Sequence, residues 1–150
     1  MNQPRTEALI EEAEQSVKIA PWRDGIWYFA HPYTVEDEDG NQILEAQAAN
    51  YRLACHRSAK LLERGVKIFS PIAHSHPIHM ASTEFLSRGE QDVWYELDNA
   101  LIDSGAFRGL ILAPGWEDSA GCCSERIRFL NQEKPVVHYQ NVIWVEDADE

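Results

Sequence analysis

Asp98 is a carboxylate in an unexpected place. Apolar residues surround it at helical offsets, namely Trp94, Leu97, Leu101 and Ile102. An ionised carboxylate loses hydration when it is buried, so burial raises its pKa and suits the group to proton transfer near neutral pH. A structural hydrogen bond to a helix end or to an arginine explains such an aspartate equally well, and the pattern alone does not separate the two interpretations.

Glu125 is the second candidate carboxylate. It follows a turn and lies at helical spacing from Cys122 and Phe129, at the border of the apolar side of a predicted helix. A carboxylate at such a border can face a pocket, although an ordinary exposed glutamate fits the same spacing. Ser119 and Gly121 stand where this helix begins, so the backbone amides there can hold an anion or a sugar hydroxyl.

Three closely spaced histidines allow two kinds of site. His74, His76 and His79 could share a zinc or iron ion, with Glu84 as a further ligand. Alternatively, their rings are exposed to solvent, or they stack on and hydrogen-bond to a flat aromatic ligand at the mouth of a site. Of these interpretations, we expect one without a metal ion.

Several other polar or aromatic residues have both a structural and a functional interpretation. Cys122 and Cys123 fit small residues that pack a helix onto a sheet better than thiolates activated by a helix N-terminus. Trp27 is predicted to lie in the core, whereas Trp116, in a loop, either belongs to the core or covers a bound aromatic ring. Arg126 fits a buried ion pair, with a ligand phosphate as the alternative.

Strand and helix patterns alternate along the chain and predict how these residues are positioned. The predicted strands are 26–30, 66–70, 107–113, 134–139 and a short run at 142–145. The predicted helices are 6–19, 44–64, 91–105 and 122–132, and 71–89 is expected to be a loop. Such alternation predicts an α/β fold with a doubly wound, mainly parallel sheet of four to five strands, Rossmann-like or flavodoxin-like, with helices on both faces.

The length of 150 residues fits a single domain, residues 1–150. Its core is predicted at about 26–138, preceded by the helix at 6–19 and followed by a short strand and an acidic tail at 142–150. Ligands of doubly wound sheets bind at the carboxyl ends of the strands. The segments that begin at His31, Ser70 and Ala113 are therefore expected to line the site.

Charge and composition exclude several classes of partner. The net charge of −12 would repel DNA or RNA, so we expect no nucleic-acid partner. No run of about 18 apolar residues occurs, and the first residues lack the pattern of a signal peptide, so a cytoplasmic protein without a membrane partner is expected. The three cysteines are an odd number and two are adjacent, which fits reduced thiols.

Three segments in chain order resemble the nucleoside 2-deoxyribosyltransferase-like family, which includes deoxynucleoside monophosphate N-hydrolases. They are YFAHPYT at 28–34, ELDNALIDSGAF at 96–107 and SAGCCSE at 119–125. Members share a first strand ending Tyr-Phe-Ala-x-Pro, an aspartate opening a helix before the third strand, and Ser-x-Gly-x-x-x-Glu after it. The resemblance spans residues 26–138 and is greatest to a bacterial and phage branch with a histidine-bearing second loop.

The resemblance implies a carboxylate mechanism that cleaves or exchanges an N-glycosidic bond without a cofactor. Glu125 would attack the anomeric carbon, Asp98 would carry the proton and Tyr28 would position the nucleophile. The residues expected to bind the nucleoside or nucleotide are His31, Pro32, His74, Trp116, Ser119 and Gly121. Relatives often complete the site with a neighbouring subunit, so a homodimer or larger homo-oligomer is expected. The alternatives are a nucleotide sensor without turnover and a metal-dependent hydrolase that uses the three histidines.

Overall fold

Four short strands form the central sheet of the computed structural model, which describes residues 24–82 and 92–148. The strands are β1 (Ile26–Ala30), β2 (Ile68–Phe69), β3 (Phe107–Leu112) and β4 (Val136–His138). All neighbouring pairs are parallel, in the order β2-β1-β3-β4. The predicted doubly wound α/β fold is confirmed, with a flavodoxin-like strand order. The helix predicted at 6–19 lies outside the described residues.

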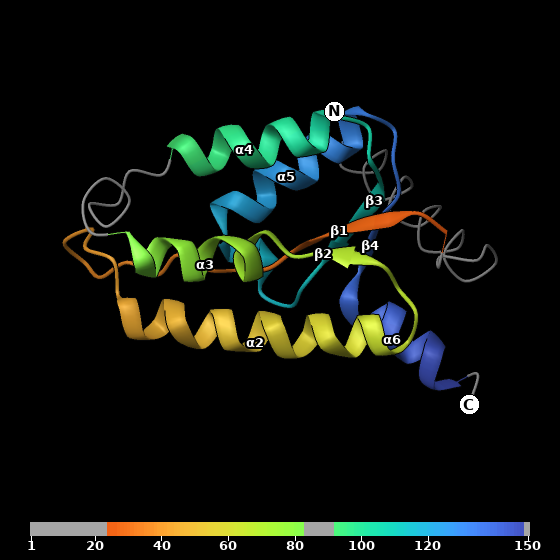
Figure 1. Cartoon of the computed structure of the whole chain (residues 1–150), viewed down its shortest axis with the longest axis horizontal. Coiled ribbons are helices and arrows are strands. Elements are labelled where there is room, and N and C mark those ends of the chain that lie inside the picture. The colour runs from red at the N-terminus through yellow and green to blue at the C-terminus, as the bar shows by residue number, and fades with distance from the viewer. Residues whose placement is uncertain (1–23, 83–91, 149–150) are drawn as a thin grey trace.

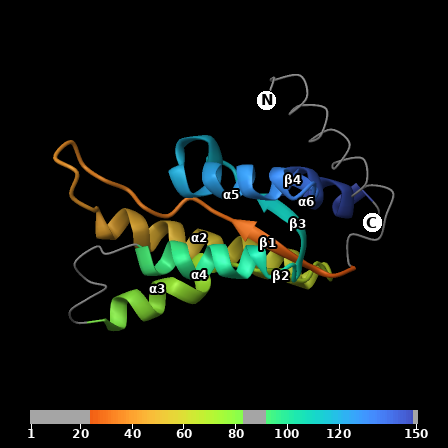
Figure 2. The same ribbon diagram turned by 90° about the horizontal axis from the view of Figure 1, so that it is seen from above.

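Helices cover both faces of this sheet. They are α2 (Leu44–Glu63), α3 (Pro71–Ala81), α4 (Asp92–Asp103), α5 (Ala120–Asn131) and α6 (Tyr139–Ala148), with the short 3₁₀-helix η2 (Trp116–Asp118) before α5. Figure 1 shows α4 and α5 on one face and α2 and α6 on the other. Seen from above in Figure 2, α2, α3 and α4 lie towards the β2 edge of the sheet, and α5 and α6 towards the β4 edge.

The alternation of side chains along β1 creates a separate core on each face of the sheet. Trp27 and Phe29 are buried in one core together with residues of α2 and α6, as predicted for Trp27. Tyr28 and Ala30 are buried in the other core, against α4 and α5. Because successive residues of β1 face opposite layers, Tyr28 lies beneath α4 and α5, the helices that carry both candidate carboxylates.

The segment after β2 is a helix, which corrects the prediction of a loop at 71–89 over its first part. Ser70 caps α3, because its Oγ accepts a hydrogen bond from the backbone N–H of Ala73 at 3.2 Å. Pro71 occupies the first turn, where a missing N–H costs nothing. Ser70 followed by Pro71 is thus a sequence pattern typical of a helix N-terminus, and the helix that it begins carries the three histidines.

The run at 142–145 is also helical, which corrects the predicted fifth strand. It lies within α6, where Val142 and Ile143 pack into the core shared with α2. A run of four apolar residues fits a buried strand and a buried helical turn equally well, because it is too short to show a period. The sheet therefore has four strands within the described residues.

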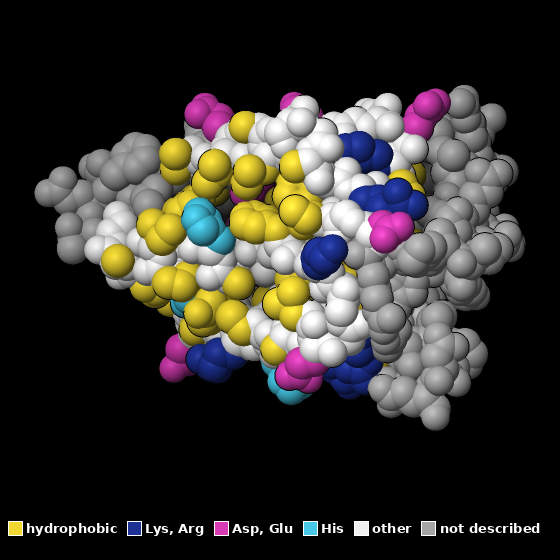
Figure 3. Space-filling model, turned by 45° about the vertical axis from the view of Figure 1, so that its right-hand side comes forward, with side chains coloured by type: hydrophobic (Ala, Val, Ile, Leu, Met, Phe, Trp, Pro, Cys, Tyr) yellow, Lys and Arg dark blue, Asp and Glu magenta, His cyan; other side chains and the backbone are white. Residues whose placement is uncertain are grey.

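Apolar side chains also remain on the surface of α2, α3 and α4. The large exposed ones on these helices are Leu44, Leu53, Leu62, Ile78, Met80, Val93, Tyr95 and Leu97. Figure 3 shows hydrophobic side chains gathered in the middle of one face, with few charged groups among them. Such surfaces often mark interaction sites, but the homodimer remains a prediction. Across the described part of the chain, every helix is too short or too polar to cross a membrane.

Candidate functional site

A pocket of about 400 Å³ opens where the strand order reverses, between the carboxyl ends of β1 and β3. Its walls come from the segments after β1, β2 and β3, as predicted, and from α4. The chain runs outward from β1 to β2 and then returns to β3 on the other side, which leaves a crevice at this point. The volume is typical of a site for a small molecule.

The hydroxyl of Tyr28 donates a hydrogen bond to Oε2 of Glu125, across 97 residues of sequence. The ring of Tyr28 is fully buried and packs edge-on against Phe107 at 5.2 Å between centroids. Burial raises the pKa of Tyr28 far above its usual range, and the charges of Glu125 and Asp98 raise it further. Tyr28 is therefore a neutral, rigidly held donor aimed at one carboxylate oxygen.

Glu125 lies on the first turns of α5 and lines the pocket. Its carboxyl group is densely surrounded by protein atoms although part of the residue is exposed to the pocket. Burial raises the pKa of Glu125 to about 8; the hydrogen bond from Tyr28 lowers it, and the charge of Asp98 raises it. Tyr28 thus favours the ionised form of a carboxylate that its surroundings otherwise keep neutral.

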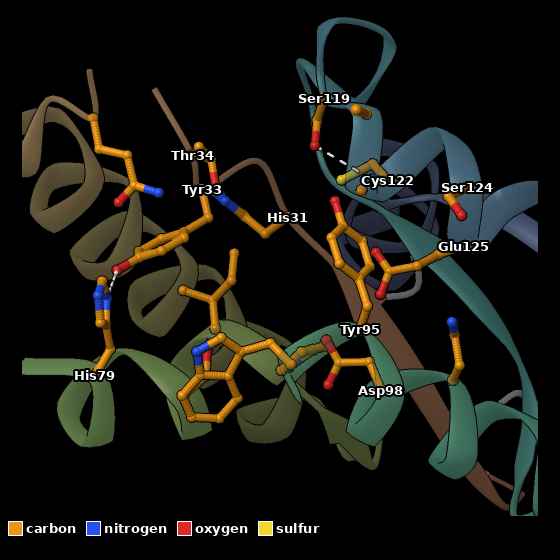
Figure 4. A pocket seen from close by; sticks show the side chains of 18 of the residues that line it. His31, Tyr33, Thr34, His79, Tyr95, Asp98, Ser119, Cys122, Ser124 and Glu125 are labelled. Atoms are coloured by element: carbon orange, nitrogen blue, oxygen red, sulfur yellow. Dashed lines mark hydrogen bonds between the residues drawn. The ribbon is translucent and has the colours of Figure 1, made fainter. Parts of the chain in front are cut away.

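Asp98 lines the same pocket from α4. It stands near the middle of this helix, not at its start, which corrects the helix-opening position implied by the resemblance. Burial raises the pKa of Asp98 to about 6, as predicted from its apolar neighbours. Figure 4 shows Asp98 and Tyr95 projecting from α4 and Glu125 projecting from α5 into one space.

His31 lines the pocket immediately after β1, and both of its ring nitrogens have partners. Nε2 lies 2.8 Å from a guanidinium nitrogen of Arg57, which can only donate, so Nε2 accepts. Nδ1 therefore carries the proton and donates to the carbonyl of Pro32 at 2.9 Å. Burial lowers the pKa of His31, and Arg57 lowers it further. This predicted ligand residue thus forms a neutral, fixed wall of the site.

Ser119 and Gly121 line the pocket at the start of α5, as predicted. The Oγ of Ser119 accepts from the backbone N–H of Cys122 at 3.2 Å and so caps the helix. One role of this serine is therefore structural: it fixes the first turn that carries Glu125. The hydroxyl proton of Ser119 remains available to a ligand, since the cap uses only a lone pair.

Ser119→Ala is expected to lower the free energy of unfolding by about 0.5–2 kcal/mol, because the N–H of Cys122 loses its cap. Ser119→Asp, which can accept the same hydrogen bond, is the matched control and should keep most of the stability. Urea denaturation of the three proteins measures the difference. Equal midpoints for wild type and Ser119→Ala would contradict the cap.

Three residues predicted to bind the ligand do not line the pocket: Pro32, His74 and Trp116. Pro32 faces Gly115, where an added Cβ would meet its ring at 3.5 Å. Trp116 packs against the core beneath α4 and α5. His74 is exposed, with its ring 6.0 Å from that of Phe69, because α3 turns it away from His76 and His79.

The residues beside Glu125 on α5 have structural roles. The guanidinium of Arg126 lies 5.2 Å from the ring centre of Trp116, in place of the predicted ion pair, which is not formed among the described residues. Cys122 is buried, and burial raises the pKa of its thiol to about 12. A thiol with so high a pKa packs as a small apolar group, as predicted, and is not activated as a thiolate.

His76 and His79 face Tyr33 rather than a shared ion. Their Nδ1 atoms lie 2.7 Å and 3.4 Å from the hydroxyl oxygen of Tyr33. Within residues 24–82 and 92–148, no three or more metal-binding side chains are grouped to hold an ion. Glu84, proposed from the sequence as a fourth ligand, lies outside the described residues. The helical form of α3 thus separates His74 from the other two histidines.

Sequence reasoning missed much of the pocket wall. Tyr33, Trp94, Tyr95 and Asn99 line it, and His79 had been considered only together with the other histidines. A signal was present on α4, because Trp94 and Tyr95 lie four and three positions from Asp98, and Asn99 lies four positions from Tyr95. Residues three and four apart share one side of a helix, so the neighbours of a functional aspartate belong to its site.

The two carboxyl groups together can supply both reagents of a displacement reaction. The pKa values, about 6 for Asp98 and about 8 for Glu125, belong to an interacting pair. Between pH 6 and pH 8 this pair holds one proton. A pair with one ionised and one protonated member offers a nucleophile and a proton donor at neutral pH. Burial outweighs the hydrogen bond from Tyr28, so between pH 6 and pH 8 the shared proton lies mainly on Glu125. The reactive form, with Glu125 ionised and Asp98 protonated, is the minor form of the pair, and the hydrogen bond from Tyr28 increases its population.

Comparison with known proteins gives a family but no activity. The sequence model of the family described as a domain of unknown function, DUF1937, matches residues 25–141, which include every element from β1 to β4 and all the pocket residues discussed above. No curated protein matches the chain.

Proposed function

The chain belongs to the DUF1937 family, and we propose that it cleaves or exchanges the N-glycosidic bond of a nucleoside with Glu125 as the nucleophile. The observation that carries this proposal is the arrangement of Tyr28, Glu125 and Asp98 at one end of a pocket of about 400 Å³. The resemblance of three segments to nucleoside 2-deoxyribosyltransferase-like proteins supports the same assignment, because it names the same three residues.

The proposed reaction is a double displacement. A carboxylate oxygen of Glu125 forms a bond to the anomeric carbon while the bond from that carbon to the base nitrogen breaks, and the base takes the proton of Asp98 as it leaves. Water or a second base then attacks the anomeric carbon, gives its proton to Asp98 and releases Glu125. Tyr28 holds Glu125 in place through both steps.

The charge of the pocket favours a nucleoside over a nucleotide. Four acidic residues line it: Glu36, Asp98, Asp118 and Glu125. No lysine or arginine among the described residues does so. The start of α5 offers backbone amides that favour an anion, but Asp118 precedes the cap and opposes a phosphate there.

We expect kcat/KM for a 2′-deoxynucleoside to exceed that for its 5′-monophosphate by roughly tenfold or more, because the phosphate meets these carboxylates. Asp118→Asn should reduce this ratio, because kcat/KM for the monophosphate should rise while kcat/KM for the nucleoside stays the same. Glu117→Gln removes a neighbouring acid that does not line the pocket and is the control. A monophosphate preferred by the wild type would contradict the charge argument.

The proposal is tested by incubating the purified protein with a panel of purine and pyrimidine nucleosides and measuring free base by chromatography, with and without a second base as acceptor. Release of a base without an acceptor indicates a hydrolase, and base exchange only in its presence indicates a transferase. Tight binding of nucleosides with no release or exchange under either condition would instead identify a binding module and reject the enzyme.

A further inference from the structure

A second polar cluster lines the pocket at the side opposite Glu125. It consists of Tyr33, which follows β1, and His79, from α3, and Figure 4 shows the two side chains in contact there. Behind them lies His76, which is buried and stacked on Tyr51 with 4.3 Å between ring centres. The carboxylate mechanism uses none of these groups, so the role of the cluster is not yet explained.

Gln47, which is buried on α2, is a further hydrogen-bonding neighbour of this cluster. Its Oε1 accepts from the backbone N–H of Val35, so its amide nitrogen is the donor elsewhere. That nitrogen donates to Oε1 of Gln42 at 3.5 Å. Burial raises the pKa of Tyr33, and a hydrogen bond from Gln47 lowers it. A hydrogen bond that favours the phenolate is one that the phenolic oxygen accepts.

The hydroxyl of Tyr33 has one proton and two lone pairs. Its shortest contact is with Nδ1 of His76 at 2.7 Å, and we assign the proton to this contact because hydroxyl donors form shorter hydrogen bonds than ring N–H donors. One lone pair accepts from Gln47, and the other faces Nδ1 of His79 at 3.4 Å. With this assignment Nδ1 of His79 carries a proton and donates to Tyr33, because two acceptors do not bond to each other. Nε2 of His79 is left as a hydrogen-bond acceptor.

The base of a bound nucleoside must point towards this cluster if Glu125 acts as proposed. In a displacement at the anomeric carbon, the attacking oxygen and the departing base lie on opposite sides of that carbon. Tyr33 and His79 lie across the pocket from Glu125 (Figure 4), on the side where the base departs.

We propose that His79 is a specificity residue that selects nucleosides whose base carries an exocyclic amino group over those with a carbonyl at the same position. Gln47, Tyr33 and His76 hold its ring in the orientation that this selection needs. The inference rests on the proposed function for the orientation of the ligand. A buried acceptor facing a carbonyl leaves both groups unpaired, whereas an amino group satisfies it.

The test compares matched bases by two readouts, calorimetric binding of adenine and hypoxanthine and kcat/KM for their 2′-deoxynucleosides. We expect the amino member to be favoured by about tenfold or more in the wild type. His79→Phe removes the acceptor and should abolish the preference. His79→Gln, whose amide can present either an oxygen or a nitrogen, should bind both bases with similar affinity. His74→Phe, an exposed position on the same helix, is the control and should keep the wild-type preference.

The outcomes separate this inference from the proposed function. Turnover with equal or reversed preference, or a preference that survives in His79→Phe, overturns the role of His79 and leaves the glycosidase intact. Preferential binding of adenine that depends on His79, without turnover of any nucleoside, supports the recognition role and rejects the enzyme. Failure of the wild type to bind or cleave either member of the pair overturns the role of His79, and the proposed function is rejected as well if no nucleoside of the wider panel is bound or cleaved.

Discussion

Glu125→Gln is expected to lower kcat for nucleoside cleavage by at least about 10³-fold, because an amide of nearly the same shape is a poor nucleophile. The fold should persist, since the hydroxyl of Tyr28 can still donate to the amide oxygen. Substrate affinity should change much less than turnover. Glu117→Gln, an exposed glutamate outside the pocket, is the matched control and should behave as wild type.

A covalent intermediate on Glu125 gives the same prediction an independent readout. A 2′-fluoro-arabino nucleoside should trap the enzyme, since the electron-withdrawing fluorine slows breakdown of the glycosyl ester once it has formed. Peptide mass spectrometry is expected to find the added sugar on the peptide that contains Glu125, and to find none in Glu125→Gln. An adduct on another residue, or undiminished turnover in the Gln variant, would reject the nucleophile.

Asp98→Asn is expected to lower kcat/KM by about 10²–10⁴-fold, because the base would leave without a proton. The loss should be largest for bases that are poor leaving groups and smallest for a nucleoside whose base is already cationic, such as a 7-methylpurine. Glu96→Gln, an exposed acid on the same helix that does not line the pocket, is the control. An equal loss for both kinds of base would assign Asp98 to structure rather than to proton transfer.

The pH profile distinguishes the two carboxylates. In the wild type, kcat/KM should be bell-shaped with limbs near pH 6 and pH 8, since the carboxyl pair is active while it holds one proton. Asp98→Asn should lose the alkaline limb, because no acid remains to be deprotonated. Its acid limb should report Glu125 alone, with a pKa below 8, because the charge of Asp98 no longer raises it. An unchanged bell in this variant would rule out the pair.

Local sequence was sufficient to predict the four strands of the sheet and the helices α2, α4 and α5. The run at 26–30 is rich in aromatic and branched residues and ends at His31-Pro32, which favoured a buried strand, and the spacing of apolar residues in α2, α4 and α5 repeats at the helical period. The position of Asp98 among apolar neighbours predicted a raised pKa for the same reason. These properties depend on residues within a few positions of each other.

The segments at 71–81 and 142–145 could not be assigned by period. The first carries histidines and a proline, and its helix depends on the cap at Ser70; the second is too short to show a repeat. For 142–145, packing against the sheet and α2 decides that the segment is a helix and not a strand. This packing arises only in the folded protein, so the local sequence pattern could not reveal it.

The sequence by itself determined the class of fold, the edge of the sheet where a site should lie and the two carboxylates. Only the tertiary structure decided which side chains meet there, because hydrogen bonds such as Tyr28 to Glu125 and Tyr33 to His76 join residues 97 and 43 positions apart. It also turned His74 and Trp116 away from the pocket and brought Tyr33 and His79 to its wall. Period and propensity act over a few residues, whereas the orientation of a side chain towards a pocket depends on how distant elements pack.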